Sequence, residues 1–211
     1  EFLYGDHPRV MTQLELGRQL RNNPLEIGRW ENLVMIQCVG SRNEEHPNCS
    51  RVCCQSAVKH ALHLADLNPD MQITILYRDV RTYGLLEEYY KSARGKGILF
   101  VRFDADRPPR VTGDGEGLCV TFRDHVLDRP IRMKTDAVVL SAGMIAPDTE
   151  ELASFLKVPR NADGYFIEAH AKLRPVDFAS EGIYLCGTAH GPKLIQEAIA
   201  QAMAAAARAA S

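Results

Sequence analysis

Short, almost wholly apolar runs are the feature that most limits the fold of this 211-residue chain. They lack the apolar/polar alternation of a half-exposed strand, and they are too short to be buried helices. Such runs are typical of strands buried on both faces of a parallel sheet. They lie at residues 33–39, 73–77 and 137–140, and the run 98–103 predicts one further strand.

Helical segments separate the first three runs. Residues 53–67 place Ala57, Ala61, Leu64 and Ala65 on one face, and a second helix is predicted over about 84–94. The resulting order, strand-helix-strand-helix-strand, favours a parallel sheet with helices packed on it. The sequence therefore predicts an α/β fold.

The segment 110–133 has a different pattern. Gly113–Gly117 is rich in glycine, and the β-prone residues 118–122 follow it. We predict a β-hairpin here, beside the parallel sheet.

The two ends of the chain are predicted from local signals. Residues 1–32 are expected to form a loop, a short helix and a linker, with Thr12 capping a helix over 13–20 and Glu15 completing a capping box. Residues 182–187 are predicted to be a strand, and Pro192 is predicted to open an alanine-rich helix that reaches about Arg208.

Composition excludes several classes of protein. The chain has 25 Lys+Arg and 27 Asp+Glu, a formal charge of -2, which argues against a nucleic-acid binder. No run of 18 apolar residues predicts a transmembrane helix, and the N-terminus does not resemble a signal peptide. We expect a cytoplasmic protein, and a processed or excised part of a longer chain because it does not begin with Met.

Cysteine is the one unusual component. Four of the six cysteines, Cys38, Cys49, Cys53 and Cys54, fall within 17 residues. In a reducing compartment such clustering indicates metal binding or redox chemistry rather than a disulfide framework. Cys38 lies near the carboxyl end of a predicted strand and the Cys53-Cys54 pair begins the next helix, which is where open α/β sheets bind ligands.

Four thiolates suit either a Zn(Cys)4 site or an iron–sulfur cluster. The vicinal pair Cys53-Cys54 does not fit the separated Cys-x2–4-Cys pairs of zinc sites, so it favours a [4Fe–4S] cluster, whose ligands bind different irons. Zinc, or a redox-active pair, stays open as an alternative.

Other residues near the cysteines have two interpretations. Arg42 and Arg51 either offset the charge of a thiolate-bound cluster or are ordinary surface arginines, and His46 is expected to be exposed. The isolated Cys119 and Cys186 are expected to be small core residues.

A glycine-rich turn follows the predicted strand 182–187 and precedes the last helix. Its backbone N–H groups would hold a phosphate or a flavin edge, or it is a plain connection. Gly113-x-Gly115-x-Gly117 precedes a strand and so fails as a dinucleotide fingerprint.

Five motifs together resemble the A subunit of heterodisulfide reductase, and the match extends over about residues 30–208. The motifs are Ile36–Arg42, Cys49–Cys54, Tyr77–Gly84, Leu140–Met144 and Leu185–Lys193. The resemblance implies a thioredoxin-reductase-like build, with a nucleotide-binding-like domain inserted into an FAD-binding domain. On that basis residues 1–28 would be a linker or remnant of the FAD domain, 29–143 the inserted domain, and 144–211 the C-terminal part of the FAD domain.

The resemblance also implies the cofactors and their contacts. Cys38, Cys49, Cys53 and Cys54 would bind a [4Fe–4S] cluster. The residues implied to contact or tune FAD are Lys59, Ala142, Gly143, Met144, Gly187, Thr188, His190, Lys193, Gln196 and Glu197. The implied function is electron transfer between FAD and the cluster, linked to flavin-based electron bifurcation.

Two features of the family are missing from the sequence: the N-terminal glycine-rich FAD fingerprint and a Cys-x2-Cys-x2-Cys ferredoxin repeat. We therefore expect other subunits of a redox complex as partners, one chain supplying the rest of the FAD site. Two alternatives are an NAD(P)H-dependent flavin disulfide reductase, with Cys53-Cys54 as the redox pair, and a zinc-stabilised assembly module.

Overall fold

The computed structural model describes residues 1–114 and 117–211, which divide into two compact units. Unit 1 comprises Glu1–Val39 and Cys53–Ala142, and unit 2 comprises Gly40–Val52 and Gly143–Ser211. This division differs from the predicted boundaries, because residues 1–28 lie in unit 1 and the loop 40–52 lies in unit 2. The identity of the predicted domains stays a prediction.

A five-stranded parallel sheet forms the centre of unit 1, in the order β1-β8-β2-β3-β4. Its strands are β1 Val10–Thr12, β8 Ala137–Ala142, β2 Asn32–Val39, β3 Gln72–Tyr77 and β4 Leu99–Arg102. The parallel sheet expected from the apolar runs is thus confirmed. The short edge strand β1 was not predicted; its pairing with β8 places the N-terminal segment in unit 1.

The helices of unit 1 follow the predicted pattern closely. They are α1 Gln13–Asn22, α2 Pro24–Ile27, α3 Cys53–Leu67, the 3-10 helix η1 Gly84–Leu86 and α4 Glu87–Gly95. The side chain of Thr12 accepts a hydrogen bond from the N–H of Glu15, whose carboxylate accepts from the N–H of Thr12. The predicted capping box is therefore present.

The predicted hairpin is part of a three-stranded antiparallel sheet. Its strands are β5 Arg110–Asp114, β6 Gly117–Asp124 and β7 Arg129–Thr135. Gly115 and Glu116 of the predicted turn lie outside the described residues. The third strand escaped prediction because β7, Arg-Pro-Ile-Arg-Met-Lys-Thr, is only lightly buried and contains proline and three cationic residues.

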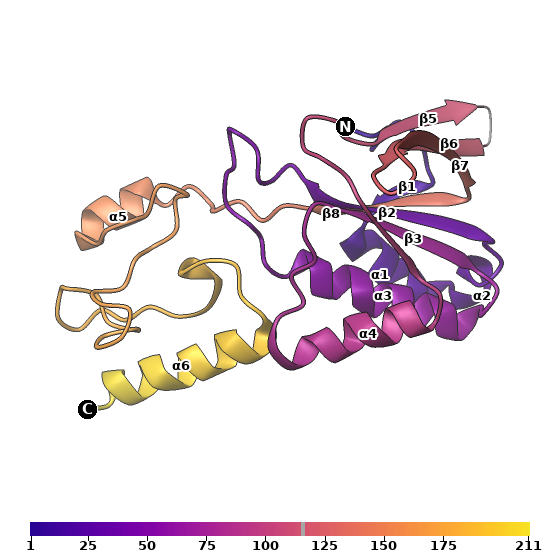
Figure 1. Cartoon of the computed structure of the whole chain (residues 1–211). Helices are drawn as coiled ribbons and strands as arrows, with labels where there is room; N and C mark the ends of the chain where they lie inside the picture. Colours follow the sequence, from indigo (N-terminus) through magenta and orange to yellow (C-terminus); the bar gives the residue numbers. More distant parts are fainter. Residues whose placement is uncertain (115–116) are drawn as a thin grey trace. The chain divides into compact units, whose positions relative to one another are not determined.

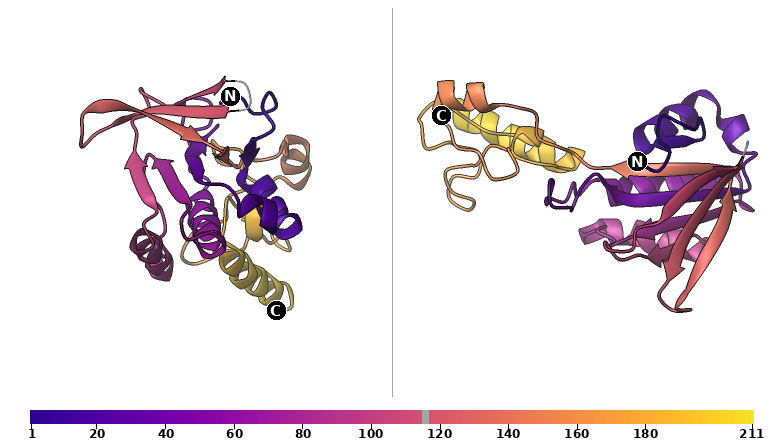
Figure 2. Two further views of the ribbon diagram at one scale, coloured as in Figure 1. Left: turned by 90° about the vertical axis from the view of Figure 1, so that its right-hand side faces the viewer. Right: turned by 90° about the horizontal axis from the view of Figure 1, so that it is seen from above.

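Two apolar cores cover opposite faces of the parallel sheet. Alternate strand residues such as Met35 and Ile75 pack with the helices, whereas Val34 and Ile36 pack with the antiparallel sheet. In Figure 1, α3 and α4 lie below the parallel strands and β5–β7 lie above them; Figure 2 shows the same strands from two other sides. Burial on both faces explains why β2 is apolar at every position except Asn32 and Gln37.

Unit 2 has little regular structure. It contains α5 Glu150–Leu156, the 3-10 helix η2 Gly187–Ala189 and α6 Ile195–Ala209, with a small core that includes Phe166, Phe178 and Leu185. The predicted strand 182–187 is wrong. Tyr184 forms only an isolated antiparallel bridge with Asp177. A strand needs a longer hydrogen-bonded ladder, and none involves residues 182–187 among the described residues.

The longest helices of the described residues, α3 and α6, have 15 residues each. Within the part of the chain that the structure describes, no helix is both long and apolar enough to cross a membrane.

Candidate functional site

Cys38 lies at the topological switch point of the parallel sheet. From β2 the chain proceeds through β3 to β4 on one side, whereas β8 and β1 lie on the other side of β2. The carboxyl ends of β2 and β8 therefore mark the position where open α/β sheets bind ligands. Cys38 has a φ of 62°, and the β2–β8 register shifts between Ile36 and Val39. Such bulges and left-handed residues are frequent at functional sites, where they redirect a side chain.

The vicinal cysteines occupy the first turn of α3. Cys53 and Cys54 are 7% and 6% exposed, and the thiol of Cys54 donates to the carbonyl oxygen of Asp79, 3.7 Å away. Asp79 follows β3, so Cys54 faces the carboxyl edge of the sheet. The positive end of a helix dipole stabilises thiolates, which are the form that binds metals.

Cys49 lies in the loop 40–52 of unit 2 and is half-buried. The backbone N–H of Arg51 donates to the Cys49 sulfur at 3.4 Å. Arg51 has a φ of 57°, a backbone conformation that L-residues seldom adopt. The loop thus already supplies a hydrogen-bond donor to one predicted ligand.

The two isolated cysteines differ from each other. Cys119 on β6 is buried, as predicted, and accepts a hydrogen bond from Nε of Arg132 at 2.9 Å. Cys186 is exposed, so its prediction as a core residue is wrong. It follows Leu185, whose side chain takes the buried position in this segment.

The donor chemistry of the four cysteines, which are close together in the sequence, fits a thiolate-bound cluster. Sulfur ligands, a helix N-terminus and a backbone N–H donor are all present. Among the described residues, no three His, Cys, Asp or Glu side chains are grouped as a site for a single metal ion. The ligand set therefore stays a prediction based on chemistry and motif.

Gly143 and Met144 are held tightly by the loop 40–52. A Cβ on Gly143 would lie 2.7 Å from Cβ of Ser41, closer than carbon atoms can approach. The N–H of Met144 donates to the hydroxyl of Ser50 at 2.7 Å, and its carbonyl accepts from the hydroxyl of Tyr165 at 3.2 Å. Ala142, the remaining member of this predicted group, is the exposed last residue of β8 in unit 1.

A pocket of about 280 Å³ in unit 2 brings together two predicted flavin contacts, Met144 and Thr188. The rest of its lining is largely apolar and includes Ile145, Tyr165 and Phe166. Small-molecule pockets usually span about 300–1,000 Å³, so this one suits part of a larger ligand.

A hydrogen-bonded chain fixes the turn that carries Gly187 and His190. Gln201 of α6 accepts from the N–H of Gly187 at 2.9 Å, and its amide nitrogen lies 2.7 Å from Nδ1 of His190. The amide nitrogen is a donor, so Nδ1 is the acceptor and Nε2 carries the proton. Nε2 lies 2.6 Å from the carboxylate of Glu168, and hydrogen bonds, first from the backbone and then from His190, lower the pKa of Glu168.

Charged side chains gather at the start of α6. Nη2 of Arg51 lies 2.8 Å from Oε1 of Glu197, and Nη1 donates to the carbonyl oxygen of Pro192 at 3.1 Å. Burial lowers the pKa of Lys193, and the positive charge of Arg51 lowers it further, whereas Glu197 and Glu168 act in the opposite direction.

The structure thus brings His190, Lys193 and Glu197 into one polar region of unit 2. Gln196 is exposed on α6, and Lys59 is exposed on α3 of unit 1. Sequence reasoning missed Glu168 and Gln201, because they lie 22 and 14 residues from the groups they bind. No local spacing signals contacts of that kind.

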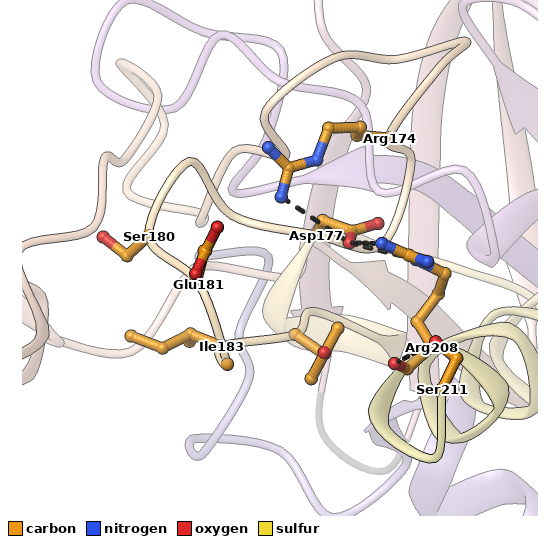
Figure 3. Close-up of a pocket in the computed structure, with 9 residues that line it drawn as sticks. Arg174, Asp177, Ser180, Glu181, Ile183, Arg208 and Ser211 are labelled. Atoms are coloured by element: carbon orange, nitrogen blue, oxygen red, sulfur yellow. Dashed lines mark hydrogen bonds and ion pairs between the residues drawn. The ribbon is translucent and has the colours of Figure 1, made fainter.

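A second, polar pocket in unit 2 measures about 490 Å³ (Figure 3). Asp177, almost fully buried, accepts two hydrogen bonds from Arg208 at 2.9 and 3.1 Å and lies 3.7 Å from Arg174. Both cations are therefore engaged with one carboxylate, which ties the end of α6 to the segment 174–184. We interpret this cluster as structural.

Comparison with solved structures defines the class of fold. The chain matches thioredoxin reductase of Lactococcus lactis with a TM-score of 0.61 at 16% identity, over 98% of this chain and 58% of that one. It matches thioredoxin reductase of T. acidophilum with a TM-score of 0.58 at 16% identity, over 99% of this chain and 57% of that one. The predicted thioredoxin-reductase-like fold is confirmed.

Sequence comparison narrows the class to one kind of subunit. The chain is 40% identical to the A subunit of the H(2):CoB-CoM heterodisulfide,ferredoxin reductase of Methanothermobacter thermautotrophicus, over 100% of this chain and 34% of that protein. It is 40% identical to the second iron-sulfur A subunit of the CoB--CoM heterodisulfide reductase of Methanopyrus kandleri, with the same two coverages. No family model matches the sequence.

These relatives confirm the resemblance that the motifs predict. The chain is a homologue of one segment of the heterodisulfide reductase A subunit. It spans about a third of the length of the curated relatives it matches.

Proposed function

We propose that this chain is an electron-transfer segment of a heterodisulfide-reductase-A-like oxidoreductase subunit. It passes electrons between FAD and a [4Fe–4S] cluster bound by Cys38, Cys49, Cys53 and Cys54. The observation that carries the proposal is the position of Cys38 at the switch point, with Cys53 and Cys54 in the first turn of α3. Ligands of open α/β sheets bind at that edge. Several relatives are named as iron–sulfur subunits.

The FAD assignment rests on unit 2 and on the class of fold. Met144 and Thr188 line one pocket, and the turn at Gly187–His190 is fixed by Gln201 and Glu168. When bound, the flavin would exchange two electrons with one partner and single electrons with iron–sulfur clusters. The chain's own contribution is to orient the ring with backbone groups, to set the charge around it with Lys193 and Glu197, and to supply the hydrogen-bonding imidazole of His190.

The site would be completed by protein beyond these residues. Relatives are about three times as long as the chain, and α6 exposes apolar side chains at helical spacing. Ile195, Ile199 and Met203 are 80%, 56% and 69% exposed. An apolar stripe on one helix face is a packing surface, and we assign it to the part of the FAD fold that carries the glycine-rich fingerprint.

Electron bifurcation is the finer form of the proposal. Two electrons would reach the flavin together and leave singly, one along a strongly reducing path and the other along a weakly reducing path. Partner subunits of a heterodisulfide-reductase-like complex would accept them. The name of the M. thermautotrophicus relative includes both a heterodisulfide and a ferredoxin, which supports this form.

Anaerobic purification with iron, sulfide and zinc analysis, followed by EPR of the reduced sample, tests the proposal. We expect about four iron and four sulfide per chain, and a reduced-cluster signal. Stoichiometric zinc without iron would instead support a zinc-stabilised assembly module. A metal-free protein with a Cys53-Cys54 disulfide that NAD(P)H reduces would support a disulfide reductase.

A further inference from the structure

Arg51 connects the cysteine loop to helix α6. Its backbone N–H donates to the sulfur of Cys49, and its guanidinium contacts both Glu197 and the carbonyl oxygen of Pro192. The second carboxylate oxygen of Glu197 accepts from the N–H of Leu194 at 2.8 Å. One residue thus links a predicted cluster ligand to the hydrogen bond that caps the first turn of α6.

The backbone at Arg51 adopts an unfavourable, left-handed conformation. Its φ of 57° costs free energy in any residue with a Cβ. The same backbone turns the N–H toward Cys49 while the side chain reaches Pro192 and Glu197. Arg51 and Glu197 are only 39% and 30% exposed, so solvent screens their interaction less than that of a typical surface pair.

From these contacts we infer that Arg51 is a positioning residue that couples the charge at Cys49 to the amino end of α6. The inference rests on the proposed function and goes beyond it. Arg51 would stabilise the additional negative charge of a reduced cluster through its cation and its N–H donor. Its ion pair with Glu197 would hold α6, and with it Lys193, in the orientation required on the flavin side.

The first test needs no metal. Backbone amide exchange of the whole chain is measured for wild type, Arg51→Gln, Arg51→Lys and Glu197→Gln. We expect the first turn of α6, residues 194–198, to exchange roughly two- to fivefold faster in Arg51→Gln and Glu197→Gln, with no further increase in the double variant. Unchanged exchange in Arg51→Gln would overturn the structural link.

The second test measures the midpoint potential of the cluster by EPR-monitored titration of the anaerobically purified chain. Replacing a cation with a neutral amide disfavours the more negative, reduced state. We expect Arg51→Gln to lower the ratio of reduced to oxidised cluster by about tenfold at fixed potential, a shift of about 59 mV for a one-electron couple. Glu197→Gln is expected to shift the potential in the opposite direction, and Arg51→Lys is expected to stay near wild type.

Arg160→Gln is the matched control, since Arg160 is a cation of the same unit that lies near Asp148 and Glu150. Equal midpoint potentials in Arg51→Gln and Arg160→Gln would overturn the inference that the charge of Arg51 stabilises the reduced cluster. If wild type binds no iron, the proposed function fails by that result, while the exchange experiment still decides the link between Arg51 and α6.

Discussion

Gly143 and Ser41 approach so closely that a Cβ on Gly143 would lie 2.7 Å from Cβ of Ser41 and 3.1 Å from the carbonyl oxygen of Gly40. Neither obstacle is the flexible end of a side chain. We therefore expect Gly143→Ala to lower the free energy of unfolding by about 1–3 kcal/mol. Chemical denaturation measures this loss, and the double variant with Ser41→Gly should recover part of it.

Gly95 is the control for that substitution. It is exposed at the end of α4, and an added Cβ meets nothing within 4 Å. Gly95→Ala should change stability by less than about 1 kcal/mol. Equal losses at the two glycines would contradict the steric explanation.

Protonation of the buried His60 is expected to make the free energy of unfolding depend on pH. Its Nδ1 lies 2.7 Å from Oε1 of the buried Gln13, and burial, with smaller contributions from Lys59 and His63, lowers its pKa from 6.5 to about 4. Between these values the unfolded chain binds more protons than the folded chain. Stability from this residue is therefore complete above pH 6.5 and is lost as the pH falls toward 4, by roughly 2–3 kcal/mol.

Denaturation midpoints between pH 7.5 and 4.5 test that dependence. His60→Gln keeps a neutral hydrogen-bonding side chain, so it should lose less stability on acidification than wild type. The exposed His63→Gln serves as the control; because His63 makes only the smallest contribution to the lowered pKa of His60, this variant should keep most of the wild-type dependence. Parallel profiles for all three proteins would show that another group is responsible.

The parallel sheet and α3 could be predicted because their signals are local. Strands buried on both faces are mostly apolar runs, and residues 53–67 form α3 as expected. The strand predicted at 182–187 failed because a β-strand needs a partner. Tyr184 finds only Asp177, so an apolar run did not become a ladder. The sequence missed β7 for the opposite reason. This polar segment has few strand-forming residues, but it finds a partner in β6 and therefore forms a strand.

The candidate site divides in the same way. The sequence predicts the spacing of the four cysteines and their position between a strand and a helix. It also predicts the glycine-rich turn at Gly187. The partners of that turn are not predicted, because Glu168 and Gln201 reach it only through tertiary structure. The sequence identifies Arg51 only as one of two arginines in the loop, and its contact with Glu197, 146 residues away, has no sequence signal.

The cysteine assignment predicts a specific pattern of iron loss. Cys53→Ala removes a proposed ligand in the first turn of α3 and should abolish the EPR signal of the reduced cluster. Cys119→Ala removes a buried thiol on β6 that interacts with Arg132 and should keep iron and signal. Loss of the cluster in Cys119→Ala, with retention in Cys53→Ala, would show that the ligand set is wrong.

Gln201 is expected to be important for the turn at Gly187. Gln201→Leu leaves the N–H of Gly187 and Nδ1 of His190 without their partner, so unit 2 should lose about 1–3 kcal/mol of stability. Gln196→Leu, on an exposed position of the same helix, should have little effect. In wild type, ¹⁵N NMR of histidine should show neutral His190 protonated at Nε2, and a proton at Nδ1 would contradict the hydrogen-bonded chain.

The pKa of Lys193 depends on the charges of Arg51, Glu197 and Glu168 in the same region. Its pKa is lowered from 10.5, first by burial and then by the positive charge of Arg51, while Glu197 and Glu168 raise it. In the metal-free chain, Arg51→Gln should therefore raise the pKa of Lys193, whereas Glu197→Gln should lower it further. Titration of ¹³C-dimethylated lysines by NMR measures both shifts, with the exposed Lys172 as an internal reference. Shifts of the same sign in the two variants would show that a change in burial, rather than the charges of Arg51 and Glu197, controls Lys193.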